Sequence, residues 1–161
     1  MSADGFTHLT SDGAVHMVDV SGKTPSVRQA SAQARVSVAP DVLDRMLNGS
    51  VPKGDVWATA RIAAILATKK CPELLPLAHT IGVHGVEVEF DTGADFIRIV
   101  VTVKTADRTG VEMEALTGAS VGALAIIDMV KGLDRTARID EIFILEKQGG
   151  RSGTWTRPDA H

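Results

Sequence analysis

The sequence predicts an α+β subunit of the ferredoxin-like type, a split β-α-β fold in which helices cover one face of an antiparallel sheet. Three observations support this prediction. Alternating and helical segments follow one another in the order strand, two helices, strand, strand, helix, strand. The 161 residues suffice for one domain with a core, and neither a repeat nor a linker divides them. The longest predicted helix is apolar on nearly every side, which predicts burial against another subunit and therefore an oligomer.

A strand and two helices make up the predicted N-terminal half. Residues 27–38 alternate apolar and polar side chains with a period near two, as a strand does. Residues 40–47 open with Pro-Asp and are followed by Asn-Gly, which are start and stop signals of a short helix. A longer helix is predicted from Asp55, a suitable N-cap, to about Lys70. Two prolines then favour a loop over residues 72–79.

A hairpin, a long helix and a last strand make up the C-terminal half. Residues 86–90 and 97–104 alternate and are joined by the turn DTGAD, so they predict an antiparallel hairpin with one packed and one partly solvated face. Residues 113–133 are rich in Ala, Leu, Ile and Val and predict the long helix. Residues 138–147 predict the last strand, which a glycine-rich segment follows.

Composition excludes several classes of function. A net charge of −3 and 4% aromatic residues argue against nucleic acid as the main partner. No stretch approaches the roughly 18 consecutive apolar residues of a membrane span, and the N-terminus lacks the pattern of a secretory signal. The single cysteine, Cys71, cannot form an internal disulfide, so we expect a reducing cytoplasm. We expect a flexible segment over residues 1–14, one domain over 15–153 and a tail over 154–161.

Acidic residues on the long helix are the first candidates for a site. Asp128 interrupts the run ALAIIDMV near the negative end of the helix dipole, where a carboxylate is disfavoured, and Lys131 lies one turn away. A structural ion pair explains these two residues equally well. Glu112 and Glu114 stand in the first turn, where capping and the dipole commonly account for acidic residues. Glu114 and Asp128 are fourteen residues apart, so one stripe carries both and can form the floor of a pocket.

Cations and one histidine complete this set. Lys53 precedes a helix N-terminus, whose dipole it opposes and whose N–H groups can join it in an anion site. Lys147 and Arg151 flank a Gly-Gly pair that can cradle a phosphate. His79 can exchange protons near neutral pH, and Arg28 adds a cation from the first strand. Solvated loop lysines, a flexible tail and an incidental histidine remain the alternative readings of these residues.

The residue types fit proton transfer on a polyanionic, phosphate-bearing substrate. The chain has neither a GxxxxGK[ST] loop nor a GxGxxG after a strand, so neither a P-loop hydrolase nor a Rossmann enzyme is indicated. Cys71 has no partner set for zinc or an iron–sulfur cluster. Spacing alone does not take the function further.

Five segments of the chain are distinctive: MVDVSGK (17–23), KGDVWATARIAAI (53–65), LLPLAHTI (74–81), RTGVEMEALTGASVGALAIIDMVKGLD (108–134) and EKQGGRSG (146–153). They resemble the MoaC family, and the resemblance runs from about Thr7 to Gly153. It implies a lyase of molybdenum-cofactor biosynthesis that converts (8S)-3′,8-cyclo-7,8-dihydroguanosine 5′-triphosphate to cyclic pyranopterin monophosphate and pyrophosphate by acid–base catalysis.

The resemblance also implies an assembly and a set of site residues. Family subunits form a homohexamer, a trimer of dimers, with active sites at subunit interfaces and without nucleic acid or membrane as partners. The family motif makes Asp128 the catalytic carboxylate with Lys131 beside it, and it requires no cofactor or protein-bound metal, although Mg²⁺ can accompany the triphosphate. The substrate-binding positions of the motif correspond to Leu77, Ala78, His79, Glu112, Met113, Glu114, Lys53, Lys147, Arg28 and Lys23.

The chain departs from the family pattern next to the histidine. The usual PLCHPL is PLAHTI here, with Ala78 for cysteine and Thr80 for proline, so a fixed backbone angle beside His79 is lost. Every ionisable family position is retained, which favours an enzyme. Two alternatives stay open: a binding subunit that keeps the anion pocket without the chemistry, and an RNA-recognition module, which the missing sheet aromatics disfavour.

Overall fold

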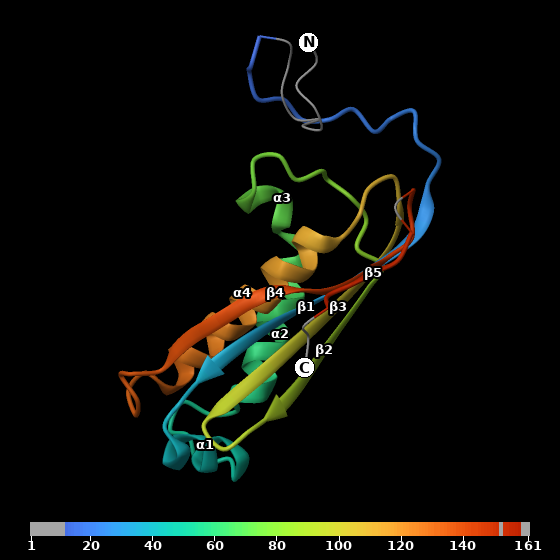
Figure 1. Cartoon of the computed structure of the whole chain (residues 1–161). Coiled ribbons are helices and arrows are strands. Elements are labelled where there is room, and N and C mark those ends of the chain that lie inside the picture. Colours follow the sequence, from blue (N-terminus) through green and yellow to red (C-terminus); the bar gives the residue numbers. More distant parts are fainter. Residues whose placement is uncertain (1–11, 152, 159–161) are drawn as a thin grey trace.

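A computed structural model describes residues 12–151 and 153–158 of the chain (Figure 1). The expected flexible segment over residues 1–14 lies mostly outside the described residues. The elements are β1 (Ser26–Ser37), α1 (Pro40–Leu47), α2 (Val56–Lys69), α3 (Cys71–Leu74), β2 (Gly85–Thr92), β3 (Phe96–Asp107), α4 (Glu112–Val130), β4 (Arg138–Gln148) and β5 (Trp155–Thr156).

The strands form one sheet in the order β2-β3-β1-β4-β5, and every neighbouring pair is antiparallel. Strands β2, β3, β1 and β4 have the arrangement of a split β-α-β fold, so the predicted fold class is confirmed. Helix α4 packs against β1, β3 and β4, and α2 packs beside it on the same face of the sheet (Figure 1). The two helices therefore cover one face and leave the other uncovered.

The core lies between this sheet and the two helices. The period-two pattern of β1 places small side chains toward the helices and polar ones on the uncovered face, where the Ser31 and Thr102 hydroxyls are 2.8 Å apart. Alanines on the inner face let α4 approach the centre of the sheet closely. The fully buried inner side chains of β1 and β3 are Ala30, Ala32, Ala34, Val36, Ile97, Ile99, Val101 and Val103.

Two glycines bring α4 close to α2. A Cβ built on Gly118 meets Thr68 Cγ2 at 2.8 Å, and one built on Gly122 meets Ile99 Cδ1 at 2.4 Å. A larger residue at either position would therefore force the helices or the sheet apart. By length and hydropathy α4 could cross a membrane, but half of its most apolar window is buried inside the subunit, as in a core helix.

Local signals explain how α1 and α2 are fixed. Asp55 accepts a hydrogen bond from the Ala58 amide at 2.9 Å, which confirms it as the N-cap of α2. Asp134, in the turn between α4 and β4, accepts hydrogen bonds from the Ala39 amide at 2.8 Å and from Thr136. This carboxylate thereby ties the start of α1 to the turn that leads into β4.

The structure adds detail to three of the expected elements. The loop expected over residues 72–79 begins with the end of α3 (Cys71–Leu74), because Pro72 occupies the first turn, where a missing N–H costs nothing. Within the segment 154–161, expected as a tail, Trp155 and Thr156 form β5, whose long-range pairing with Glu146 and Lys147 of β4 is not indicated by a local sequence pattern. Helix α4 ends at Val130, because the amides of Leu133 and Asp134 both turn back to the Val130 carbonyl oxygen.

Candidate active site

Asp128 lies between two lysines at the C-terminal end of α4. Lys131 Nζ lies 2.6 Å from Asp128 Oδ1, and Lys53 Nζ lies 3.2 Å from Oδ2. Lys53, from the loop before α2, also donates to the Asp128 backbone carbonyl oxygen at 2.7 Å. We call these three residues the Asp128 cluster. Two ammonium groups around one carboxylate leave the cluster with a net positive charge.

The Asp128 cluster is open to solvent. The side chain of Asp128 is 57% exposed, so the expected penalty from apolar surroundings does not apply. Hydrogen bonds and positive charge from Lys131, followed by those from Lys53, lower the pKa of Asp128 below its ordinary value. The carboxylate is therefore ionised at neutral pH and can act as a base or hold an ammonium group in place. Exposed ion pairs contribute little to the stability of a fold, so stability does not account for the presence of this cluster.

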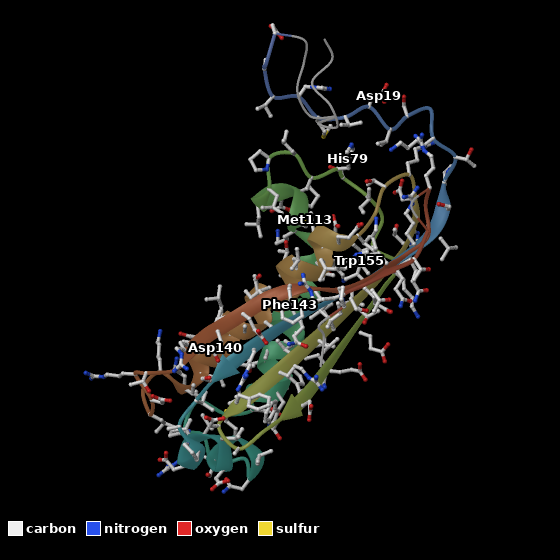
Figure 2. All side chains as sticks on the ribbon, in the orientation of Figure 1. Asp19, His79, Met113, Asp140, Phe143 and Trp155 are labelled. Atoms are coloured by element: carbon white, nitrogen blue, oxygen red, sulfur yellow. The ribbon has the colours of Figure 1, made fainter. Side chains whose placement is uncertain are left out.

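The N-terminal end of α4 borders a separate cavity of about 320 Å³. It contains His79, whose Nε2 lies 2.7 Å from the Val18 carbonyl oxygen of the N-terminal segment. Figure 2 shows His79 and Met113 at the same end of the molecule, below the segment that carries Asp19. We call this cavity the histidine hollow; its lining residues are Leu77, Ala78, His79, Thr109, Gly110, Glu112, Met113 and Glu114.

The two glutamates of this hollow have different environments. Glu112 faces Lys147, with Oε1 3.7 Å from Nζ. Glu114 is only 3% exposed, and its burial raises its pKa, while its own backbone amide, the neighbouring Cys71 thiol and the charge of His79 lower it. Neither residue is the N-cap of α4, because Val111 takes that position. Burial makes Glu114 a costly residue that capping does not explain.

A wider apolar hollow adjoins the histidine hollow. It measures about 590 Å³ and shares Leu77, Ala78 and Met113 with its neighbour. Leu77 and Met113 are 37% and 44% exposed, so apolar side chains border the charged groups directly. Together, the two hollows offer apolar side chains beside acid–base groups, which suits a heterocyclic ligand.

A third cavity, of about 490 Å³, is basic. Arg28 is fixed by donation from Nε to the Asp107 carbonyl oxygen at 3.1 Å, and the Lys23 carbonyl oxygen accepts from Arg108 at 3.0 Å. None of the described residues that line this cavity is acidic. We call it the basic hollow; its lining residues are Gly22, Lys23, Thr24, Ser26, Arg28, Gly150 and Arg151.

The glycine turn after β4 is shaped to fit against Arg28. Gly149 and Gly150 both have positive φ angles, +89° and +71°. A Cβ on Gly149 would lie 2.4 Å from the Val27 carbonyl oxygen, and a Cβ on Gly150 would lie 2.5 Å from Arg28 Nη1. Only glycine permits this close approach, so the turn holds Arg151 at the rim of the basic hollow.

The single chain divides the predicted site residues between the two ends of α4. Glu114 and Asp128 are fourteen residues apart on this helix, which is about 21 Å along its axis. One pocket of a single chain therefore does not have both carboxylates as its floor, contrary to expectation. Lys53 lies with Asp128 and Lys131, whereas the other predicted substrate-binding residues lie around the histidine and basic hollows.

Sequence reasoning missed one residue that contacts the site. Val18 supplies the carbonyl oxygen that meets His79, and no property of a valine side chain could have indicated this. Cys71 was considered for disulfide and metal chemistry alone; the structure buries it fully, and burial raises the pKa of its thiol to about 11.

Comparison with known proteins places the chain in a family. The model of the MoaC family matches residues 17–150. The chain belongs to the MoaC family. The cyclic pyranopterin monophosphate synthase of Streptomyces avermitilis is 51% identical over 154 residues, which cover 96% of this chain and 91% of that protein.

Other members of the MoaC family match over a similar length. The protein of the same name from Geobacter sulfurreducens is 49% identical over 156 residues, which cover 96% of this chain and 98% of that protein. Cyclic pyranopterin monophosphate synthase 2 of Mycobacterium bovis is 47% identical over 152 residues, which cover 94% of this chain and 91% of that protein. The match to each relative thus includes both ends of α4 and the loops around them.

Proposed function

We propose that this chain is a lyase of molybdenum-cofactor biosynthesis that converts (8S)-3′,8-cyclo-7,8-dihydroguanosine 5′-triphosphate to cyclic pyranopterin monophosphate and pyrophosphate. The observation that carries the proposal is the Asp128 cluster, intact in a chain 47–51% identical to synthases of that product. The polar residues of the histidine hollow and the cations of the basic hollow agree with the same chemistry.

The product requires phosphoryl chemistry as well as ring rearrangement. A cyclic monophosphate forms when a sugar hydroxyl oxygen attacks the α-phosphorus of the triphosphate. The new O–P bond replaces the bond to the bridging oxygen, pyrophosphate leaves, and the hydroxyl proton passes to a base. The rearrangement of the sugar and purine requires further proton transfers, for which a lysine beside an ionised carboxylate is suited.

The Asp128 cluster supplies these proton transfers in our proposal. Lys131 and Asp128 act on the sugar and purine, and Lys53 keeps the carboxylate ionised and oriented. The side chain of Lys131 is 61% exposed, so a substrate can reach its ammonium group. His79, Glu112 and Glu114 orient the substrate or pass protons on.

The triphosphate occupies the basic hollow in the same proposal. Lys23 and Arg28 line it, and phosphate oxygens form short, charge-assisted hydrogen bonds with such groups. Lys147 lies nearby, opposite Glu112. The heterocycle would rest against Leu77 and Met113, which adjoin the hollow of His79.

We propose that each complete site combines residues of two subunits in a homohexamer, a trimer of dimers. The support is the distance of about 21 Å between Glu114 and Asp128 on α4, which is more than one sugar and purine can bridge. Leu124, on α4 between the two ends, is 56% exposed and offers apolar surface for a partner. A second copy would bring its Asp128 cluster to the histidine hollow of the first.

We also propose a cytoplasmic location, and that any Mg²⁺ in the reaction arrives with the triphosphate. Among the residues that the structure describes, no three or more His, Cys, Asp or Glu side chains are grouped to hold a metal ion. The phosphate oxygens would then be the main ligands of Mg²⁺, which prefers oxygen and retains several waters.

A coupled assay tests the proposed function. The isolated cyclic triphosphate is supplied to the wild type and to Lys131→Ala, and both oxidised pterin fluorescence and released pyrophosphate are followed. We expect both products from the wild type and a loss of at least about 100-fold in the variant. A folded wild type that gives neither product overturns the proposal.

The second candidate function is a binding subunit without chemistry. Ala78 and Thr80, which replace the family's cysteine and proline beside His79, are the observation that favours it. This candidate predicts that the wild type binds the cyclic triphosphate tightly in calorimetry and releases no pyrophosphate. Turnover by the wild type excludes it.

A further inference from the structure

The last residues of β3 hold the loop that carries His79. After His79 the chain runs to β2 without regular structure, and residues 79–83 contain no proline that would fix their backbone angles. Within this stretch, the backbone of Gly82 is hydrogen-bonded at both of its polar groups. Its amide donates to Asp107 Oδ2 at 3.2 Å, and its carbonyl oxygen accepts from Thr105 Oγ1 at 2.6 Å. Both partners belong to β3, so the loop is fixed three residues after the histidine.

The same aspartate also contacts the basic hollow. The Asp107 carbonyl oxygen accepts from Arg28 Nε at 3.1 Å, and Arg28 lines that hollow. The next residue, Arg108, donates from Nε to the carbonyl oxygen of Lys23, the second cation proposed for the triphosphate, at 3.0 Å. The end of β3 therefore joins the loop of His79 to the segments that carry both cations.

We propose that Asp107 is a positioning residue that holds His79 and the cations of the basic hollow in a fixed relation, with Thr105 as a second anchor of the loop. Asp107 is not among the residues that line either hollow, so it acts through Gly82 and Arg28. The inference rests on the proposed function, in which one substrate spans both hollows. Such a substrate reacts only when the groups at its two ends are correctly placed.

The carboxylate of Asp107 is suited to this role because it uses both of its oxygens. Oδ1 accepts from the Arg108 amide at 2.7 Å, while Oδ2 accepts from the Gly82 amide. These two bonds, that from Arg108 first, lower the pKa of Asp107 below its ordinary value, and the charges of Arg108 and His84 act in the same direction. The side chain is therefore ionised at neutral pH, and an ionised acceptor forms the stronger hydrogen bonds.

Thr105 anchors the other side of the same peptide unit. Its side chain is buried, with only 2% of the residue exposed, and a buried hydroxyl requires a partner, which the Gly82 carbonyl oxygen supplies. The loop then reaches β2 at His84, whose amide donates to the Lys104 carbonyl oxygen at 2.9 Å and whose Nδ1 accepts from the Ala106 amide at 3.3 Å. Residues 104–107 thus hold this loop at two successive points.

Steady-state kinetics separate positioning from phosphate binding. In Asp107→Ala, kcat should fall by about 10-fold or more, because the loop of His79 gains freedom. The inhibition constant of pyrophosphate should stay close to the wild type, because Arg28 is bound by a backbone carbonyl group that the substitution keeps. Asp91→Ala is the matched control: Asp91 also accepts from the amide of the next residue, Thr92, at 2.9 Å, and it should keep the wild-type kcat.

Two substitutions of Thr105 distinguish the hydrogen bond from packing. Thr105→Val keeps the shape of the side chain and loses the donor, so kcat should fall as in Asp107→Ala. Thr105→Ser keeps the donor and loses a methyl group, so kcat should stay close to the wild type. A role in packing alone predicts the opposite order for the two variants.

Hydrogen–deuterium exchange of the unliganded proteins measures the loop directly. Peptides that cover residues 80–84 should exchange about 10-fold faster in Asp107→Ala and Thr105→Val than in the wild type, because local opening becomes easier when an anchor is lost. The same peptides should exchange at the wild-type rate in Thr105→Ser and Asp91→Ala.

Three results overturn the inference. The first is a folded Asp107→Ala protein whose kcat and loop exchange match the wild type, and the second is a loss of kcat that Asp91→Ala reproduces. The third is a rise of the pyrophosphate inhibition constant as large as the fall in kcat, which would assign Asp107 to phosphate binding alone. If Asp107→Ala does not fold, the two Thr105 variants decide. A wild type without turnover would refute the proposed function instead, and loop exchange would still test the anchoring.

Discussion

Lys53 binds Asp128 twice, through the backbone carbonyl oxygen at 2.7 Å and through Oδ2 at 3.2 Å. This contact joins the loop before α2 to the last turn of α4, where unpaired carbonyl groups concentrate negative charge. The ammonium group therefore stabilises the helix end and the carboxylate together. Lys131 contacts the same carboxylate from its other side, so the pair becomes a charged cluster open to substrate.

The first prediction concerns the charge of Asp128. Asp128→Asn keeps the shape of the side chain and removes the base, so kcat should fall by about 100-fold or more. Asp91→Asn is the matched control, because Asp91 forms an exposed ion pair with Arg98 at 2.7 Å on β2 and β3 that includes no residue of the cluster. Steady-state pyrophosphate release measures both. Equal activity of Asp128→Asn and the control would refute the role of this carboxylate.

The second prediction concerns the triphosphate. Arg28→Gln removes a cation that lines the basic hollow, so KM for the cyclic triphosphate should rise by about 10-fold or more, with a smaller effect on kcat. The inhibition constant of pyrophosphate should rise in parallel. Arg98→Gln, on the sheet beside Asp91, removes the same charge elsewhere and should leave both constants unchanged. An equal rise of KM in Arg28→Gln and Arg98→Gln would indicate a general effect of net charge and would contradict a triphosphate site in the basic hollow.

The third prediction concerns Asp134 and pH. Hydrogen bonds from Thr136 and from the Ala39 amide lower the pKa of Asp134 below its ordinary value of 3.8. Its contribution to stability is therefore fully present above about pH 4 to 5 and is lost as the pH falls through the lowered pKa. Asp134→Ala should cost about 1–3 kcal/mol at pH 7 and much less near pH 2. Urea unfolding at pH 7 and near pH 2 measures the loss in the free energy of unfolding. An equal loss at both pH values would contradict the prediction.

The fourth prediction concerns the contact between α2 and α4. Gly118→Ala places a methyl group 2.8 Å from Thr68 Cγ2, so crowding should outweigh the gain in helix propensity by about 1 kcal/mol. Gly132→Ala meets no atom within 4 Å and should leave stability close to the wild type. Thermal unfolding of the two variants makes the comparison. A stabilised Gly118→Ala would mean that the helices can move apart at little cost.

Most of the fold could be predicted because local signals agreed with the tertiary structure. The alternation of β1 and the N-cap Asp55 each specify their element within a few residues. Strand β5 could not be predicted, because Trp155 and Thr156 are ordered by pairing with β4 and by the stacking of Arg157 on Phe143 at 4.5 Å. The end of α4 depends on hydrogen bonds to the Val130 carbonyl oxygen, and no single residue type in the sequence predicts these bonds.

The site was predictable as a set of residues and not as an arrangement. Charge in an apolar context singled out Asp128, and the spacing to Lys131 indicated their contact. The helical period also suggested that Glu114 and Asp128 share a pocket, which a single chain does not allow. The period gives the direction of a side chain around the helix but not its distance along the axis. The burial of Glu114 follows from the packing around the start of α4, which the sequence pattern did not indicate.

Subunit complementation tests the central claim most directly. Asp128→Asn removes the carboxylate at the C-terminal end of α4, and His79→Ala removes the imidazole from the hollow beside its N-terminal end. Each variant alone should therefore be almost inactive. If each site combines the two ends from different subunits, oligomers co-assembled from equal amounts of both variants should regain about a quarter of the wild-type activity, the random share of sites with two intact halves. A mixture no more active than its two components would contradict the shared site.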